Sequence, residues 1–273
     1  MAVPASIDAA ARHPWVKPLA RAGFAARAAV YFIIGTFAVL AAFGRSEVKG
    51  TKGALAALLS QPFGQALLWL AIIGLAGFAL WRFVQAWADS DGHGDAAKGL
   101  VVRAALAVSG IAHAGLAIFA ARMALGWGSG GGDPSGRWIA AGYAAGYGRW
   151  LTWAAAAIML GIAVAQVWKA WRATFDRYFR GCPPEVMGWL RPLARFGLAA
   201  RGVTFAIIAS LIFYGGLRYR GAEGGSTPGL ADALQAVQGY AFGWLLLLVV
   251  ALGLIAFSFY SLAAARYRRV QVT

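Results

Sequence analysis

The chain has 273 residues, of which 60% are apolar and only 13% are charged. This composition excludes an ordinary water-soluble protein, because too few charged side chains are available to cover its surface. The net charge of +15 would suit a nucleic-acid-binding protein, but the cations lie at the ends of apolar runs and in short loops. We therefore expect no nucleic acid as a partner and attribute the charge to anionic lipids of the inner membrane leaflet.

Six segments contain no Asp, Glu, Lys or Arg, and each can hold one helix that crosses a bilayer, which takes about 17–25 mainly apolar residues. In chain order they run 28–44, 53–81, 104–121, 150–168, 202–217 and 233–265. Strands of a membrane barrel would alternate polar and apolar residues over about ten positions, which these runs do not. The sequence therefore predicts an all-α membrane protein with six transmembrane helices.

The six segments repeat as three two-helix hairpins. The first helix begins LARAGFAARAAVYFIIG at Leu19, and the fifth begins LARFGLAARGVTFAIIA at Leu193. The second helices match as well, with GQALLWLAIIGLAGF from Gly64 and GWLLLLVVALGLIAF from Gly243. The middle copy, GRWLTWAAAAIMLGI from Gly148, keeps the leading glycine but is more divergent. Internal repeats of this kind indicate an architecture built from one duplicated unit.

The first helix of the middle hairpin fits the pattern loosely. Arg103 takes the place of Arg21, but Ser109 falls where the other copies have Arg27 and Arg201. Three hairpins that share one orientation are expected around a pseudo-threefold axis along the membrane normal. We expect a cytoplasmic tail at 1–18 and repeats at 19–90, 98–180 and 191–269.

The outer connection of each hairpin has the pattern of a short amphipathic helix that lies at the membrane interface. The apolar positions are Leu55, Leu58 and Leu59 in the first, Ile139, Tyr143 and Tyr147 in the second, and Leu230, Leu234 and Val237 in the third. Lys and Arg number 17 on the side of the two termini and eight on the other. The positive-inside rule then predicts a multi-pass protein of the bacterial inner membrane with both termini in the cytoplasm.

The LAR-x-G-x-AAR start, the QPFG before the second helix and the three-hairpin layout resemble the bacterial domain-of-unknown-function 1206 family of six-helix integral membrane proteins. The resemblance covers roughly Leu19 to Arg269. Its departures are Ser109 and the absence of QPFG at Gly148 and Gly243. The resemblance implies a fold and a membrane location, and it brings no activity, substrate or catalytic residue.

Two arginines are the first candidates for a binding site. Arg27 and Arg201 lie about one turn inside the starts of the first and fifth helices. A guanidinium binds two oxygens of a phosphate or lipid headgroup at once, and the positive end of a helix would reinforce that binding. The alternative is that both side chains extend to the inner leaflet while their stems cover apolar surface.

His113 and Gln166 are the other candidates within the spans. His113 would serve in proton transfer or haem ligation, or it would be a neutral imidazole bonded to a backbone carbonyl or to Ser109. Gln166 would line a polar path or form a hydrogen bond across helices. No motif for a catalytic nucleophile, a metal or a phosphate-binding loop occurs, and Cys182 is the only cysteine. We expect no catalytic residue, metal or cofactor.

Two functions remain open. The first is a non-enzymatic structural or accessory component that packs against a second membrane protein. The alternative is a small-solute or anion transporter or channel with a path along the pseudo-threefold axis. An enzyme acting on lipid or haem is disfavoured, because no nucleophile–base pair or carboxylate pair is apparent.

Overall fold

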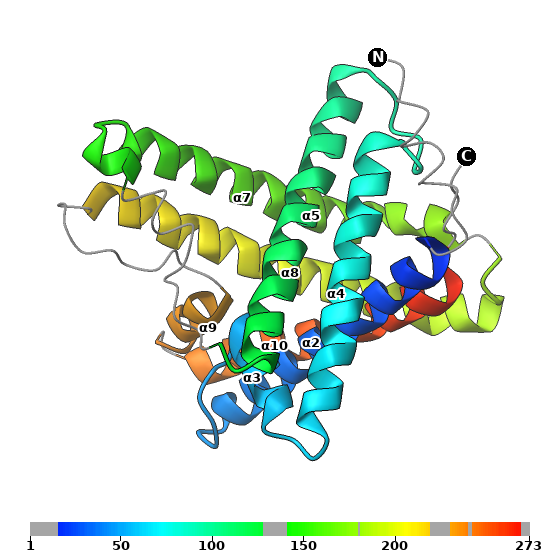
Figure 1. Ribbon diagram of the computed structural model, residues 1–273, viewed down its shortest axis with the longest axis horizontal. Coiled ribbons are helices and arrows are strands. Elements are labelled where there is room, and N and C mark those ends of the chain that lie inside the picture. The colour runs from blue at the N-terminus through cyan, green and yellow to red at the C-terminus, as the bar shows by residue number, and fades with distance from the viewer. Residues whose placement is uncertain (1–15, 128–140, 180, 219–229, 240–241, 269–273) are drawn as a thin grey trace.

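A computed structural model describes residues 16–127, 141–179, 181–218, 230–239 and 242–268, and these residues form helices joined by turns (Figure 1). Six helices are long and apolar enough to cross a membrane: α2 (Val16–Ala42), α4 (Gly64–Trp87), α5 (Ala97–Ala124), α7 (Gly148–Arg172), α8 (Pro184–Arg218) and α10 (Gly243–Tyr267). The shorter elements are α3 (Thr51–Leu59), η1 (Thr174–Phe179) and α9 (Leu230–Gln238). The described residues include no strand. The predicted all-α fold with six apolar helices is confirmed.

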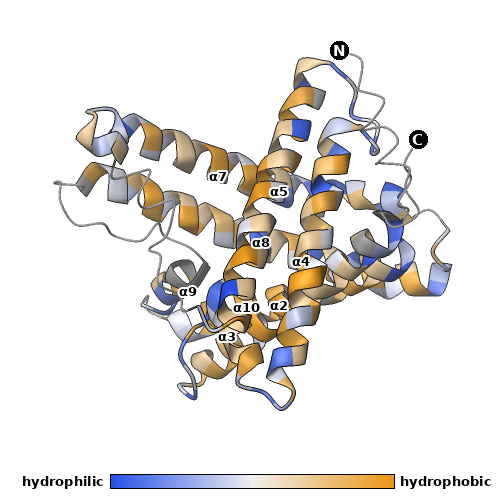
Figure 2. Cartoon of the chain, in the orientation of Figure 1, coloured by the Kyte–Doolittle hydropathy of each residue, from blue (hydrophilic) through white to orange (hydrophobic). Residues whose placement is uncertain are grey.

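The second helix of each hairpin packs along the first helix of the next hairpin. These three junctions are α4 with α5, α7 with α8, and α10 with α2. Figure 1 shows the α4–α5 pair running steeply across the nearly horizontal α7–α8 pair, and α2 beside α10. The third junction joins the first and last spans of the chain. Figure 2 shows apolar residues along the helices, with hydrophilic residues gathered in the connections and at helix ends.

The first hairpin is closed by two close approaches between α2 and α4. A Cβ atom on Gly23 of α2 would collide with Phe78 of α4, and a Cβ atom on Gly74 of α4 would collide with Ala26 of α2. Small residues at such contacts let two backbones come together, which is how helices associate where no water drives them.

The third hairpin repeats both approaches at the matching positions. Gly197 of α8 faces Phe257 of α10, and Gly253 of α10 faces Ala200 of α8. The glycines shared by the two LAR-x-G-x-AAR helices and by their partners therefore have one physical role, which is close packing within a hairpin.

The second hairpin lacks this packing. Its residues at the four corresponding positions are Ala105, Val108, Ile158 and Ile162. Ala105, Val108 and Ile158 are bulkier than their counterparts, which opposes close packing of α5 along α7. Val108 and Ile158 are 50% and 56% exposed. The arrangement of three hairpins around a pseudo-threefold axis that the sequence predicts is therefore not confirmed, because the path of packed helices is interrupted between α5 and α7.

At two of the three junctions, an arginine donates hydrogen bonds to carbonyl groups at the end of the preceding helix. Arg103 of α5 donates from Nε to the carbonyl of Ala86 (2.7 Å) and from Nη2 to that of Trp87 (3.0 Å), at the end of α4. Arg195 of α8 binds the corresponding two carbonyls of α7, at 2.9 and 3.0 Å. The last carbonyl groups of a helix have no partner within the helix. Arg103 and Arg195, which occupy the same repeat position, provide hydrogen bonds to them.

The short helices α3 and α9 lie at the opposite end of the bundle and pack onto its core through Leu55, Leu234 and Val237. Each is followed by a sharp turn into a span, where Phe63 and Phe242 adopt left-handed backbone conformations. The corresponding segment of the second hairpin begins at Ile139, which lies outside the described residues, although residues 141–144 are helical.

We predict that Gly253→Ala lowers the free energy of unfolding by about 1–3 kcal/mol, because the new methyl group overpacks the α8–α10 contact at Ala200. Gly161→Ala in α7 is the matched control, since a Cβ atom there meets nothing within 4 Å and alanine favours a helix. Unfolding of both variants in a denaturing detergent titration checks the prediction. Equal stability of the two variants would contradict it.

Candidate functional site

Arg27, near the middle of α2, is enclosed by aromatic rings. Its side chain is 6% exposed, and its Nε donates to the Ser261 hydroxyl of α10 at 3.2 Å. The guanidinium carbon lies 5.1 Å from the ring centre of Phe24, 4.9 Å from that of Phe78 and 5.1 Å from that of Phe257. Cation–π contacts of this kind stabilise a desolvated charge by about 0.5–2 kcal/mol each.

Arg201 of α8 is held in the same way. Its guanidinium carbon lies 4.7 Å from the ring centre of Phe257, 4.9 Å from that of Phe205 and 5.3 Å from that of Tyr31. No described residue accepts a hydrogen bond from it, and its Nε is buried. Arg27 and Arg201 therefore share the ring of Phe257, so the structure brings these two candidates together.

A third arginine, Arg82, joins them; it lies just past the charge-free segment 53–81 and so counts, in the sequence, with the loop that follows. The guanidinium carbon of Arg82 in α4 lies 4.7 Å from the ring centre of Phe78, which Arg27 also contacts. Its Nη1 donates to Gln85 Oε1 at 3.0 Å, and its buried Nε has no partner among the described residues. Arg82 and Arg201 both lie close enough to repel the charge of Arg27. We call Arg27, Arg82 and Arg201 the arginine triad.

The triad takes one arginine from each junction between hairpins. When the repeats are aligned on their leading glycines, Arg82 of α4 corresponds to Gln166 of α7 and to Ser261 of α10. On the partner helices, Ser109 corresponds to Arg201 and Arg27. The α4–α5 junction therefore also has one arginine, but it lies on the second helix of the hairpin, as Arg82, while Ser109 takes the arginine position on α5. Comparing the second helices of the repeats position by position would have revealed Arg82.

On α7, Gln166 occupies the repeat position of Arg82, and Lys169 lies within electrostatic range of the triad. Gln166 is 8% exposed, and its amide makes no hydrogen bond within the described part of the chain. Lys169, one turn further, is exposed, and the charges of Arg82, Arg201 and Arg268 all repel it. This end of α7 therefore adds a fourth cation beside the triad, together with an amide that can donate or accept.

His113 occupies a position that holds an aromatic ring in the other hairpins. It corresponds to Tyr31 and Phe205. Its ring centre lies 4.5 Å from that of Phe78, just as Tyr31 lies 4.9 Å from Phe257. Its Nδ1 lies 2.7 Å from the backbone carbonyl of Ser109, as expected for a neutral imidazole that donates this hydrogen bond. The ring therefore packs as part of the aromatic shell of the triad.

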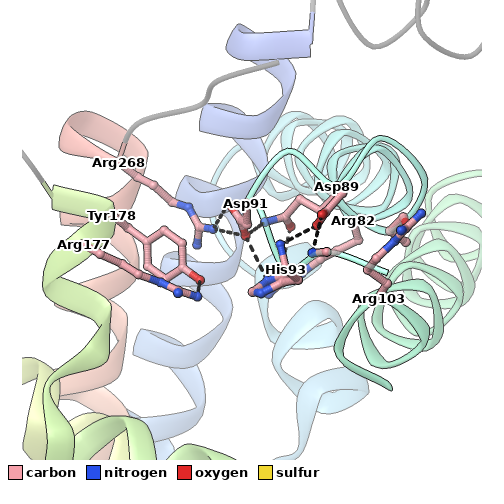
Figure 3. Close-up of polar contacts among 11 residues, drawn as sticks. Arg82, Asp89, Asp91, His93, Arg103, Arg177, Tyr178 and Arg268 are labelled. Carbon is pink, nitrogen blue, oxygen red and sulfur yellow. Dashed lines mark hydrogen bonds and ion pairs between the residues drawn. The ribbon is translucent and has the colours of Figure 1, made fainter. Parts of the chain in front are cut away.

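One buried carboxylate lies beside this cluster (Figure 3). Asp91, in the connection from α4 to α5, accepts from Gln85 Nε2 at 2.6 Å and from Arg268 Nη2 at 3.0 Å. Asp91 and Arg268 are each 8% exposed, so this ion pair ties the α4–α5 connection to the end of α10. Asp91 is already paired with Arg268, but it also attracts the charge of Arg82 and is linked to Arg82 by hydrogen bonds through Gln85. The described residues provide no other carboxylate to the triad.

A second carboxylate, that of Asp89, accepts hydrogen bonds from the backbone of the same α4–α5 connection. Burial by itself would raise the pKa of Asp89, but the amides of Gly94 (2.6 Å) and His93 (2.8 Å) donate to it and hold the pKa below its ordinary value. Burial lowers the pKa of His93, and this effect exceeds the attraction of Asp91, whose oxygen lies 4.0 Å away. His93 therefore contributes a neutral ring at neutral pH rather than a further cation.

The site as a whole offers guanidinium groups and no acid–base pair among the described residues. No group of three or more His, Cys, Asp or Glu side chains suited to a metal ion occurs among them. The triad gathers positive charge and hydrogen-bond donors around the rings of Phe78 and Phe257, and this is the chemistry that recognises an oxyanion.

Comparison with known proteins matches three segments of the chain, 22–89, 104–173 and 196–268, to the family model described as Domain of Unknown Function (DUF1206). The chain is also 30% identical over 259 residues to the Bacillus subtilis (strain 168) protein YxxB, which is described as uncharacterized. That match covers 94% of this chain and 93% of YxxB. No solved structure matches the chain.

We predict that Asp91→Asn lowers the free energy of unfolding by about 3–5 kcal/mol, because it leaves the buried Arg268 guanidinium without a counter-ion. The matched control is Asp95→Asn in the same connection. The Asp95 carboxylate is 80% exposed, so its ion pair with Arg103 contributes at most about 1 kcal/mol. Thermal unfolding of the purified variants measures both effects, and a loss for Asp95→Asn as large as that for Asp91→Asn would refute the assignment.

Proposed function

We propose that this chain, which belongs to the DUF1206 family, is a non-enzymatic membrane protein that binds an anionic group at the triad of Arg27, Arg82 and Arg201. Of the two functions expected from the sequence, the arginine triad favours the one that handles an anion. Transport of that anion along the axis of the bundle would use the same site.

The observation that carries the proposal is the convergence of three guanidinium groups, none of which forms an ion pair with a described carboxylate; Asp91, which attracts Arg82, is already paired with Arg268. Burying one charge without a partner costs several kcal/mol, and three like charges add mutual repulsion. Aromatic faces offset part of this cost, but apart from the bonds of Arg27 to Ser261 and of Arg82 to Gln85 they leave the N–H donors of the guanidinium groups without acceptors among the described residues. An oxyanion would both neutralise the charges and accept those hydrogen bonds.

The architecture that we propose for this function is threefold. Each junction has one arginine, one ring at the position of Tyr31, His113 or Phe205, and one pair of packed helices. This supports three repeats, at 19–90, 98–180 and 191–269, around a pseudo-threefold axis along the membrane normal. The bias of Lys and Arg supports cytoplasmic termini and an inner-membrane location. In this arrangement α3 and α9 lie at the outer interface, and the triad lies in the inner half of the bilayer.

An accessory role is the second candidate, and the second hairpin favours it. A Cβ atom added to Gly115 of α5 or to Gly161 of α7 would meet nothing within 4 Å. Small residues exposed on a spanning helix provide a surface against which a helix of another membrane protein can pack closely. Purification of a defined complex through these faces would support this role.

We predict that inorganic phosphate raises the thermal unfolding midpoint of the protein in neutral detergent, at constant ionic strength set with chloride. A ligand that binds only the folded state adds about 2.7 kcal/mol of stability at one hundred times its Kd. Arg201→Gln should abolish the shift. The same variant should unfold at a higher temperature than the wild type without phosphate, because one repelling charge is gone.

Arg172→Gln is the matched control, since Arg172 is exposed at the end of α7 and lies over Trp168 rather than in the triad. It should retain the full phosphate response. A wild-type protein that responds to phosphate no more than to chloride would refute the proposed site. An undiminished response in Arg201→Gln would refute it as well.

A further inference from the structure

The interrupted packing between α5 and α7 leaves apolar faces of both helices uncovered around Val108 and Ile158, and we call these two faces the side entrance. In the first and third hairpins, the residues matching Val108 and Ile158 face each other across a closed helix contact. In the second hairpin these two apolar side chains are 50% and 56% exposed. The walls between α5 and α7 therefore present hydrocarbon where the other two hairpins are sealed.

The same side of the bundle is basic at its inner end. His113 of α5 contacts the triad's aromatic shell through Phe78, while Lys169 of α7 is exposed and lies within electrostatic range of Arg82 and Arg201. A molecule between α5 and α7 would meet the triad and Lys169 at one end, and the apolar walls over the rest of its length.

The depth of the triad sets how far a lipid phosphate must enter the apolar layer to reach it. Arg27 lies seven residues beyond Ala20, where the apolar span of α2 begins. At 1.5 Å per residue this places it about 10 Å from the end of the span. A long side chain such as arginine can extend part of that distance toward the headgroup region.

We propose that an anionic phospholipid, from the leaflet in which the triad lies, binds between α5 and α7. Its phosphate lies on the arginine triad and an acyl chain lies against Val108 and Ile158. This inference rests on the proposed anion site and names its ligand class. The charge of the site selects an anionic headgroup, and the apolar walls select a ligand that carries chains. A free oxyanion would use only the first of these features, and an apolar helix of a partner protein only the second.

The test compares three soluble probes by calorimetric titration of the purified protein in neutral detergent. Dihexanoyl-phosphatidylglycerol carries the anion and the chains, glycerol 3-phosphate carries the anion alone, and dihexanoyl-phosphatidylcholine carries the chains without net charge. We expect phosphatidylglycerol to bind at least about tenfold more tightly than glycerol 3-phosphate, because several methylene groups leave water. We expect no saturable binding of phosphatidylcholine.

A closing variant isolates the side entrance. Combining Ala105→Gly, Val108→Ala, Ile158→Gly and Ile162→Phe gives the second hairpin the residues with which the first hairpin closes. In this variant, phosphatidylglycerol should bind no more tightly than glycerol 3-phosphate, whose own affinity should not change. If the variant does not elute as a folded species, Val108→Trp fills the same space with one substitution.

The outcomes separate the two proposals. Equal binding of phosphatidylglycerol and glycerol 3-phosphate to the wild type, or an undiminished phosphatidylglycerol preference in the closing variant, would overturn the lipid site and leave the anion site in place. Absence of binding by both anions would overturn both. Saturable binding of phosphatidylcholine with the same affinity would show that the entrance selects chains alone, which also refutes the proposal.

Discussion

Every hairpin depends on its neighbour, because the second helix of one packs along the first helix of the next. In lipid no hydrophobic force draws two helices together, so the contact must come from close packing and from polar groups that find partners. The junctions supply both. Arg103 and Arg195 donate hydrogen bonds to the carbonyl groups at the ends of α4 and α7. Each junction also holds one arginine of the triad.

The aromatic shell around the triad explains how three guanidinium groups stay in one place. Phe78 is shared by Arg27 and Arg82, and Phe257 is shared by Arg27 and Arg201. A ring face attracts a cation without accepting a hydrogen bond in the plane of the guanidinium, so the N–H groups remain available to a ligand. The cluster is therefore costly to the folded protein and useful for binding, which is typical of functional sites.

Much of this arrangement could be predicted from the sequence. The six apolar helices, the matching glycines and the two arginines Arg27 and Arg201 are visible as local patterns, because bilayer thickness and close packing constrain residue type directly. Arg82 was missed because it was counted with a loop, although alignment of the second helices places it opposite Ser109. The interruption between α5 and α7 was also present in the sequence, in the bulky residues that replace small ones.

Other features depend on contacts that no local pattern encodes. The ion pair of Asp91 with Arg268 joins residues that are 177 positions apart, and nothing near either residue indicates the other. The role of His113 was open between chemistry and packing, because a ring that is polar at its edge and flat on its faces suits both. The contact of its ring with Phe78 and the hydrogen bond to the Ser109 carbonyl show that His113 packs against α4 and bonds to its own helix.

The junction of α10 with α2 has a consequence for biosynthesis. The bond from Arg27 to Ser261 spans 234 positions, so the first span leaves the ribosome long before its neighbour exists. During that interval Arg27 has neither Ser261 nor Phe257 beside it, and a charge in the bilayer is tolerated only by reaching toward water. Arg27 therefore gains these two partners only after α10 has been inserted beside α2.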